Sequence, residues 1–103
     1  MSAVVVTLVG DIDLANQQET TALLDDGVAR ARLAQTDLHV ELSKVTFLGS
    51  TGISCLVQAS LALGPTMSLH LVNPTPAARR ILELCGLDHY VLDESGSDLS
   101  SAD

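Results

Sequence analysis

Two hydroxyl residues between two glycines are the side chains of this chain best placed for chemistry. The segment Gly49-Ser50-Thr51-Gly52 follows strand-like residues and precedes a helical pattern. A hydroxyl at a helix start can cap the N–H groups of the first turn, and the positive end of the helix also favours an added phosphate. Ser50 is therefore either a plain helix N-cap or a phosphorylation site, with Thr51 as the second candidate acceptor. The two glycines suit a tight turn or the close approach of a partner.

Enzyme chemistry at this serine finds no support in its surroundings. A G-x-S-x-G elbow needs glycine where Leu48 stands, and a P-loop needs Gly-Lys after the turn. Asp11 and Asp13 form a carboxylate pair without a base or a metal ligand beside them. The three histidines and two cysteines have no metal-ligand spacing. We therefore expect a protein that is not an enzyme and has no cofactor or metal.

The composition predicts one small domain with an aliphatic core. The chain has 103 residues, 47% of them hydrophobic, with no Trp, and its net charge is −8. A chain of this size forms a single core. An acidic surface disfavours nucleic acid and favours a protein partner with basic contacts. No signal peptide or apolar stretch of membrane-spanning length is seen, so we expect a cytoplasmic protein without membrane insertion.

Strand and helix patterns alternate along the chain. Residues 4–9 resemble a strand buried on both faces, and the helix that begins near Asn16 should bury Leu24, Gly27, Val28 and Ala31. A strand over 37–43 continues into residues 45–48, and further strands are expected at 68–72 and 90–92. A last helix, capped by Thr75 with Pro76 after it, should end before Gly86. The order is β-α-β-α-β-α-β, which predicts an α/β fold with a mixed or mostly parallel sheet of four or five strands and helices packed on it.

The helix after Ser50 has two distinguishable sides. Its bulky stripe follows the i, i+3, i+4, i+7, i+8 template and should face the core, at Ile53, Leu56, Val57, Ser60 and Leu61. The other side carries small and polar residues and is either solvated or a contact surface, at Cys55, Gln58, Ala59 and Ala62. Cys85 lies on the stripe of the last helix and should be buried, so we do not expect a disulfide with Cys55.

Three segments together resemble the STAS domain family, named for sulfate transporters and anti-sigma factor antagonists. Gly10-Asp11-Ile12-Asp13 is similar to the family's G-E-L-D, and residues 40–52, ending in Gly49-Ser50-Thr51-Gly52, are similar to a strand leading into D-S-[ST]-G. Residues 71–74 with 81–87 form the third segment. The resemblance covers residues 4–92, places the STAS domain at 1–92 and leaves 93–103 as an acidic, Ser-rich tail that we expect to be disordered.

The resemblance implies an anti-sigma factor antagonist. Such a protein binds an anti-sigma factor of histidine-kinase-like ATPase fold and so releases a sigma factor. The same partner, using ATP and magnesium, phosphorylates the serine, and a phosphatase reverses the modification. By position Ser50 is the phosphoacceptor, and the contact surface comprises Asp13, Asn16, Gly49, Thr51 and Gly52 together with the outer side of the following helix, at Cys55, Gln58, Ala59 and Ala62.

One position departs from the family pattern, because Gly49 stands where the family has aspartate. The departure makes partner binding a firmer expectation than phosphorylation. It also keeps an alternative open, in which the domain is an unphosphorylated structural subunit of a lipid transporter or a signalling complex.

Overall fold

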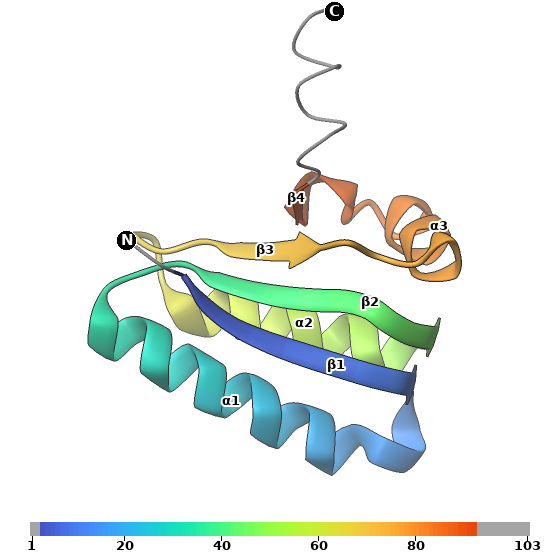
Figure 1. The fold of residues 1–103 in the computed structure, drawn as a ribbon, viewed down its shortest axis with the longest axis horizontal. Helices are drawn as coiled ribbons and strands as arrows, with labels where there is room; N and C mark the ends of the chain where they lie inside the picture. Colours follow the sequence, from blue (N-terminus) through green and yellow to red (C-terminus); the bar gives the residue numbers. More distant parts are fainter. Residues whose placement is uncertain (1–2, 93–103) are drawn as a thin grey trace, which may run out of the picture.

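A four-stranded parallel sheet with three α-helices makes up the fold (Figure 1). The computed structural model describes residues 3–92, so the predicted tail at 93–103 lies outside the described residues. In chain order the elements are β1 (Val4–Ile12), α1 (Gln17–Ala34), β2 (Leu38–Leu48), α2 (Ser50–Leu63), β3 (Leu69–Val72), α3 (Pro76–Leu84) and β4 (Val91–Leu92), with short 3-10 helices η1 (Leu14–Asn16) and η2 (Asp88–Tyr90). The predicted α/β order is confirmed, and the described strands number four.

Every strand of the sheet runs in the same direction, in the spatial order β1-β2-β3-β4. The β1–β2 register runs from Val4 opposite Leu38 to Ile12 opposite Leu48. The carboxyl ends of both strands therefore meet at one edge of the sheet. At that edge β1 leads into η1 and β2 leads into α2. The turns around Asp13 and Ser50 therefore lie close together.

Helices α1 and α2 pack side by side, with α2 behind the strands and α1 along β1 in the view of Figure 1. The predicted core side of α1 is confirmed, since Leu24, Gly27, Val28 and Ala31 are all buried. Gly27 permits close contact with the sheet, because a Cβ there would lie 2.5 Å from Cγ2 of Val6. Aliphatic side chains fill the core throughout.

Strand β1 is buried on one face only, which corrects the expectation of two buried faces. Its side chains alternate, with Val6 and Leu8 buried while Val5 and Val9 are 54% and 63% exposed. The uninterrupted run of β-branched residues predicts a doubly covered strand, but α1 covers just one face of this edge strand.

The buried side of α2 is rotated relative to the predicted stripe. The core residues are Gly52, Leu56, Ala59 and Leu63, whereas Leu61 is 70% exposed. Because α2 contacts α1 as well as the sheet, the small residues Gly52 and Ala59 share its buried side with Leu56 and Leu63.

The last helix ends one residue earlier than its hydrophobic stripe suggests. Thr75 caps α3 with Pro76 at its first position, and Gly86 follows with a φ of 74°, both as predicted. The helix itself stops at Leu84, so Cys85 leaves the stripe and is exposed, contrary to the expectation that it is buried.

Polar groups tie together the amino-terminal edge of the sheet. Asp37 accepts a hydrogen bond from the Ser68 backbone N–H at 2.9 Å, and its other oxygen lies 3.2 Å from Nε2 of His70. The Ser68 N–H, followed by His70, lowers the pKa of the Asp37 carboxyl. The polar groups of Asp37, Ser68 and His70 therefore pair with one another at this edge.

None of the helices within residues 3–92 is long and apolar enough to cross a membrane.

Candidate functional site

Two chain segments, residues 10–16 and 46–52, build the region around Ser50. The Gly49 N–H donates a 2.8 Å hydrogen bond to the carbonyl of Ile12, which joins the end of β1 to the start of α2. The Thr46 hydroxyl also donates to the Asp11 carboxylate. These bonds bring Asp13 and Gly49, which are far apart in sequence, into one site, as the sequence predicts.

Ser50 is the first residue of α2, and the N-cap is Gly49. The glycine has no side chain to cap the helix, so the N–H groups of the first turn receive no side-chain cap. Ser50 is exposed, and its hydroxyl makes no hydrogen bond among residues 3–92. The interpretation of Ser50 as a plain N-cap is therefore wrong, and the hydroxyl is available for another purpose. Thr51, the second candidate acceptor, is half-buried.

The loop after β1 is stiffened by its own side chains. Asp13 caps η1 by accepting from the Ala15 N–H at 3.1 Å. Asn16 accepts from the Asp13 N–H at 2.9 Å and donates to the carbonyl of Asp11. Both residues are expected at a contact surface, and the structure places Asp13 beside Gly49, with Asn16 bonded to Asp13. Their hydrogen bonds assign them a further role, which is to hold the loop in shape.

The two glycines of the turn do different things. At Gly52 a Cβ would lie 2.8 Å from side-chain carbons of both Ile12 and Leu48, so α2 rests directly on the end of β1. Gly52 is buried, which corrects its assignment to the outer surface. At Gly49 a Cβ would lie 3.1 Å from Cε2 of Phe47 and 3.4 Å from Cβ of Asp13. Gly49 therefore lets the Phe47 ring and the Asp13 side chain pack closely against the backbone of the turn.

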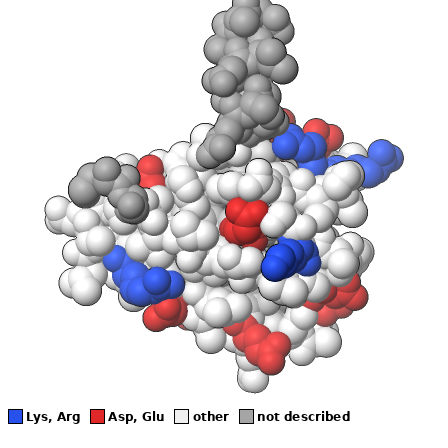
Figure 2. All heavy atoms as spheres, in the orientation of Figure 1, with Lys and Arg blue, Asp and Glu red and all other residues white. Residues whose placement is uncertain are grey.

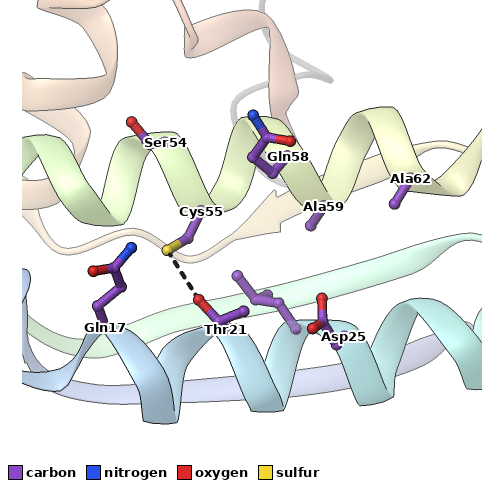
Figure 3. A pocket seen from close by; sticks show the side chains of 9 residues that line it. Gln17, Thr21, Asp25, Ser54, Cys55, Gln58, Ala59 and Ala62 are labelled. Atoms are coloured by element: carbon purple, nitrogen blue, oxygen red, sulfur yellow. Dashed lines mark hydrogen bonds between the residues drawn. The ribbon is translucent and has the colours of Figure 1, made fainter.

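The side of α2 predicted to face a partner borders a groove against α1. This groove has a volume of about 270 Å³, and its lining includes Cys55, Gln58, Ala59 and Ala62. Figure 3 shows Cys55, Ala59 and Ala62 pointing toward α1, with the Cys55 Sγ 3.6 Å from the Thr21 hydroxyl oxygen. Ala59 is buried and Cys55 packs partly against the core, so their expected position away from the core is wrong. Gln58 and Ala62 are exposed, as expected.

Two apolar side chains at the site were not predicted from the sequence. Leu14, directly after Asp13, is 73% exposed, and Phe47, two residues before Gly49, is 49% exposed. A usable signal was present for Phe47, because strand alternation places it on the opposite face from the buried Leu48. Leu14 had no such signal, since the sequence does not distinguish an exposed leucine in a turn from one that packs into the core.

Charge at the site is acidic. Within residues 10–16 and 46–52 the charged residues are Asp11 and Asp13. Figure 2 shows one face of the whole molecule, where uncharged atoms dominate and Lys and Arg atoms stand in separate groups near acidic ones. On this face no broad basic surface of the kind that binds nucleic acid is seen.

Comparison with protein families identifies the class. The family described as "Mlab, STAS domain" matches residues 1–93, which is nearly the whole chain. The chain therefore belongs to the STAS domain family, in agreement with the parallel sheet and the Ser50 turn described above.

A curated relative narrows the comparison within that family. Over 85 residues the chain is 33% identical to the anti-sigma-F factor antagonist RsfB of Mycobacterium tuberculosis. The match covers 82% of this chain and 66% of RsfB, and the same protein in a second strain of that organism matches equally.

Solved structures share the fold. An anti-sigma factor antagonist from Mycobacterium paratuberculosis superimposes with a TM-score of 0.74 at 28% identity, covering 96% of this chain and 85% of that one. The unphosphorylated form of the anti-sigma factor antagonist SpoIIAA gives a TM-score of 0.68 at 20% identity, covering 96% and 88%. At that identity, SpoIIAA supports the fold alone.

Proposed function

We propose that this protein is an anti-sigma factor antagonist. It binds an anti-sigma factor of histidine-kinase-like ATPase fold, which frees a sigma factor, and phosphorylation of Ser50 ends the binding. The observation that carries the proposal is the exposed hydroxyl of Ser50, which makes no hydrogen bond within residues 3–92, on the first turn of α2, whose N-cap is Gly49. Its relatives, named as anti-sigma factor antagonists, support the choice of partner.

Phosphorylation at this position would act through charge. A phosphate adds about −1.5 to −2 charges next to the carboxylates of Asp11 and Asp13. The first-turn N–H groups of α2 would stabilise that charge in the free protein. In a complex the same charge would be buried at the centre of the contact, where an unpaired charge costs several kcal/mol. The modified protein should therefore fold normally and release its partner.

A pull-down tests this proposal. Wild-type, Ser50→Ala and Ser50→Asp proteins serve as baits in lysate of the source organism, and mass spectrometry identifies what each retains. We expect an ATPase-fold anti-sigma factor with wild type and Ser50→Ala, and its loss with Ser50→Asp. Equal recovery of that partner by all three baits would remove Ser50 as the switch. Incubation of wild type and Ser50→Ala with the recovered partner and Mg-ATP then tests the kinase step, and a phosphatase should restore binding.

Gly49 favours a second candidate, an unphosphorylated structural subunit of a transporter or signalling complex. The family's aspartate beside the serine would supply an acceptor that Gly49 lacks. On this alternative all three baits retain the same membrane or scaffold proteins in fixed ratio, and no phosphate is incorporated.

A further inference from the structure

Phe47 and Leu14 belong to the two segments that build the Ser50 region and are not part of the core. Phe47 is 49% exposed and Leu14 is 73% exposed, although the large apolar residues beside them in sequence, Leu48 and Ile12, are buried. Exposed apolar side chains are common singly, but a pair next to a binding site is typical of the anchors of an interface.

The geometry around Gly49 places these side chains together. The point where a Cβ of Gly49 would stand lies 3.1 Å from Cε2 of Phe47 and 3.4 Å from Cβ of Asp13. Leu14 follows Asp13 directly, and Ser50 follows Gly49. The ring of Phe47 and the Asp13 turn, which carries Leu14, therefore both lie close to Gly49, the residue before Ser50.

The same surface has a defined charge. Asp11, which is exposed, and Asp13 are the charged residues of residues 10–16 and 46–52, and the whole chain carries a net charge of −8. The hydrogen bonds from Thr46 to Asp11 and from the Ala15 N–H to Asp13 fix these carboxylates in place without neutralising them. The apolar pair is therefore bordered by fixed negative charge.

We propose that Phe47 and Leu14 are the apolar anchors of the partner interface, and that they insert into an apolar pocket bordered by Arg or Lys side chains of the partner. The proposal rests on the proposed function and names the chemistry of the partner's docking surface. Cationic groups around the pocket would pair with Asp11 and Asp13, and burial of the two apolar side chains would supply most of the affinity.

Titration calorimetry with the purified anti-sigma factor tests the anchors. Phe47→Ser and Leu14→Ser should each weaken binding by more than ~10-fold. Leu33→Ser and Leu84→Ser are matched controls, because these leucines are 88% and 72% exposed elsewhere on the molecule, and they should change the affinity by less than about twofold. Phe47→Leu should recover part of the loss, and thermal melts of each variant verify folding. If Phe47→Ser does not fold, Leu14→Ser still tests the proposal.

The charge half of the proposal has its own variant. Asp11→Asn keeps an oxygen that can accept from Thr46 and removes the charge, so it should weaken binding and reduce the salt dependence of the affinity.

The outcomes separate the two proposals. Binding by wild type with no difference between the anchor and control variants would overturn the anchors and leave the proposed function standing. Absence of any binding by wild type would remove the proposed function, and the anchors with it. Sedimentation of the protein alone tests whether a second copy of this chain binds the same surface. A dimer that dissociates in the Phe47→Ser variant would show that it does, and would overturn the proposal.

Discussion

The helices that follow β2 and β3 begin in contrasting ways at the same edge of the sheet. At α3 the Thr75 hydroxyl accepts from the Ala78 N–H at 3.2 Å and donates to the Val45 carbonyl at 2.8 Å. At α2 the N-cap is Gly49, no side chain caps the first turn, and the hydroxyl of Ser50 stands one position later without a hydrogen bond within residues 3–92. One helix start uses its hydroxyl for stability, and the other leaves its hydroxyl exposed. The difference separates a structural turn from one that a partner can use.

The largest loss of stability is expected from a substitution that disrupts the contact positioning α2. In Gly52→Ala the new methyl group meets Ile12 and Leu48 at 2.8 Å and the Ile12 carbonyl oxygen at 3.0 Å. Overpacking should lower the free energy of unfolding by about 1–3 kcal/mol despite the better helix propensity of Ala. Urea denaturation measures the loss. Ser54→Ala, on the exposed side of α2, should stay within about 0.5 kcal/mol of wild type, and equal stability of the two variants would contradict the close contact at Gly52.

Removal of the Thr75 cap tests the contribution of the side-chain cap at the start of α3. Thr75→Ala loses the bond to the Ala78 N–H and leaves the Val45 carbonyl without its donor, which should cost about 1–2 kcal/mol. Thr75→Ser keeps the hydroxyl and should retain most of the stability in thermal melts. Alanine and serine variants of equal stability would mean that this hydroxyl stabilises nothing.

A cap added to α2 should make the two helix starts more alike. Gly49 has φ −86° and ψ 177°, an extended conformation that any residue adopts, and the half-exposed ring of Phe47 has room to shift. Gly49→Asn should therefore raise stability by a few tenths of a kcal/mol, whereas Gly49→Ala, which has no acceptor, should be less stable than Gly49→Asn by about 1 kcal/mol. Differential scanning calorimetry resolves the order, and an alanine variant that matches the asparagine variant would argue against an uncapped first turn.

The smallest effect is expected at the opposite edge of the sheet, at Asp37. The pKa of Asp37 is lowered from 3.8, chiefly by the Ser68 N–H and then by His70. A carboxyl whose folded pKa lies below its unfolded value contributes stability above the unfolded pKa and loses it as pH falls through the folded one. Wild type should therefore lose melting temperature below about pH 4 slightly faster than Asp37→Asn does. Parallel curves for the two proteins would contradict the shift.

Much of the arrangement was predictable from local signals. Alternating strand and helix patterns predict the α/β order, and the Thr75-Pro76 and Gly86 signals mark both ends of α3. The Ser50 turn was predictable because turn residues follow a strand and precede a helix. Such signals reside in single segments, and the parallel register then brings the Asp13 and Ser50 turns together.

The features that could not be predicted depend on contacts between segments. In α2 hydrophobicity favours the side with Ile53, Val57 and Leu61, but the side with Gly52 and Ala59 is buried, because small residues allow the close approach of α1 and β1. Strand alternation predicts the face on which Phe47 lies, but how much of its ring stays exposed depends on what the partner strand and Gly49 leave uncovered. Hydropathy alone does not report how much room a neighbour leaves.

The pairing of the strands becomes shorter from one end of the sheet to the other. β1 and β2 pair at eight positions, β2 and β3 at four, and β3 and β4 at two. Local unfolding begins where the fewest backbone contacts must be broken, so the end at β4, where Tyr90 and Val91 are only partly buried, opens at a lower free energy than the β1–β2 ladder. The Ser50 turn follows the longest strand pairing among the described residues, and a protease or a chaperone that engages the β4 end would leave that turn in its native shape.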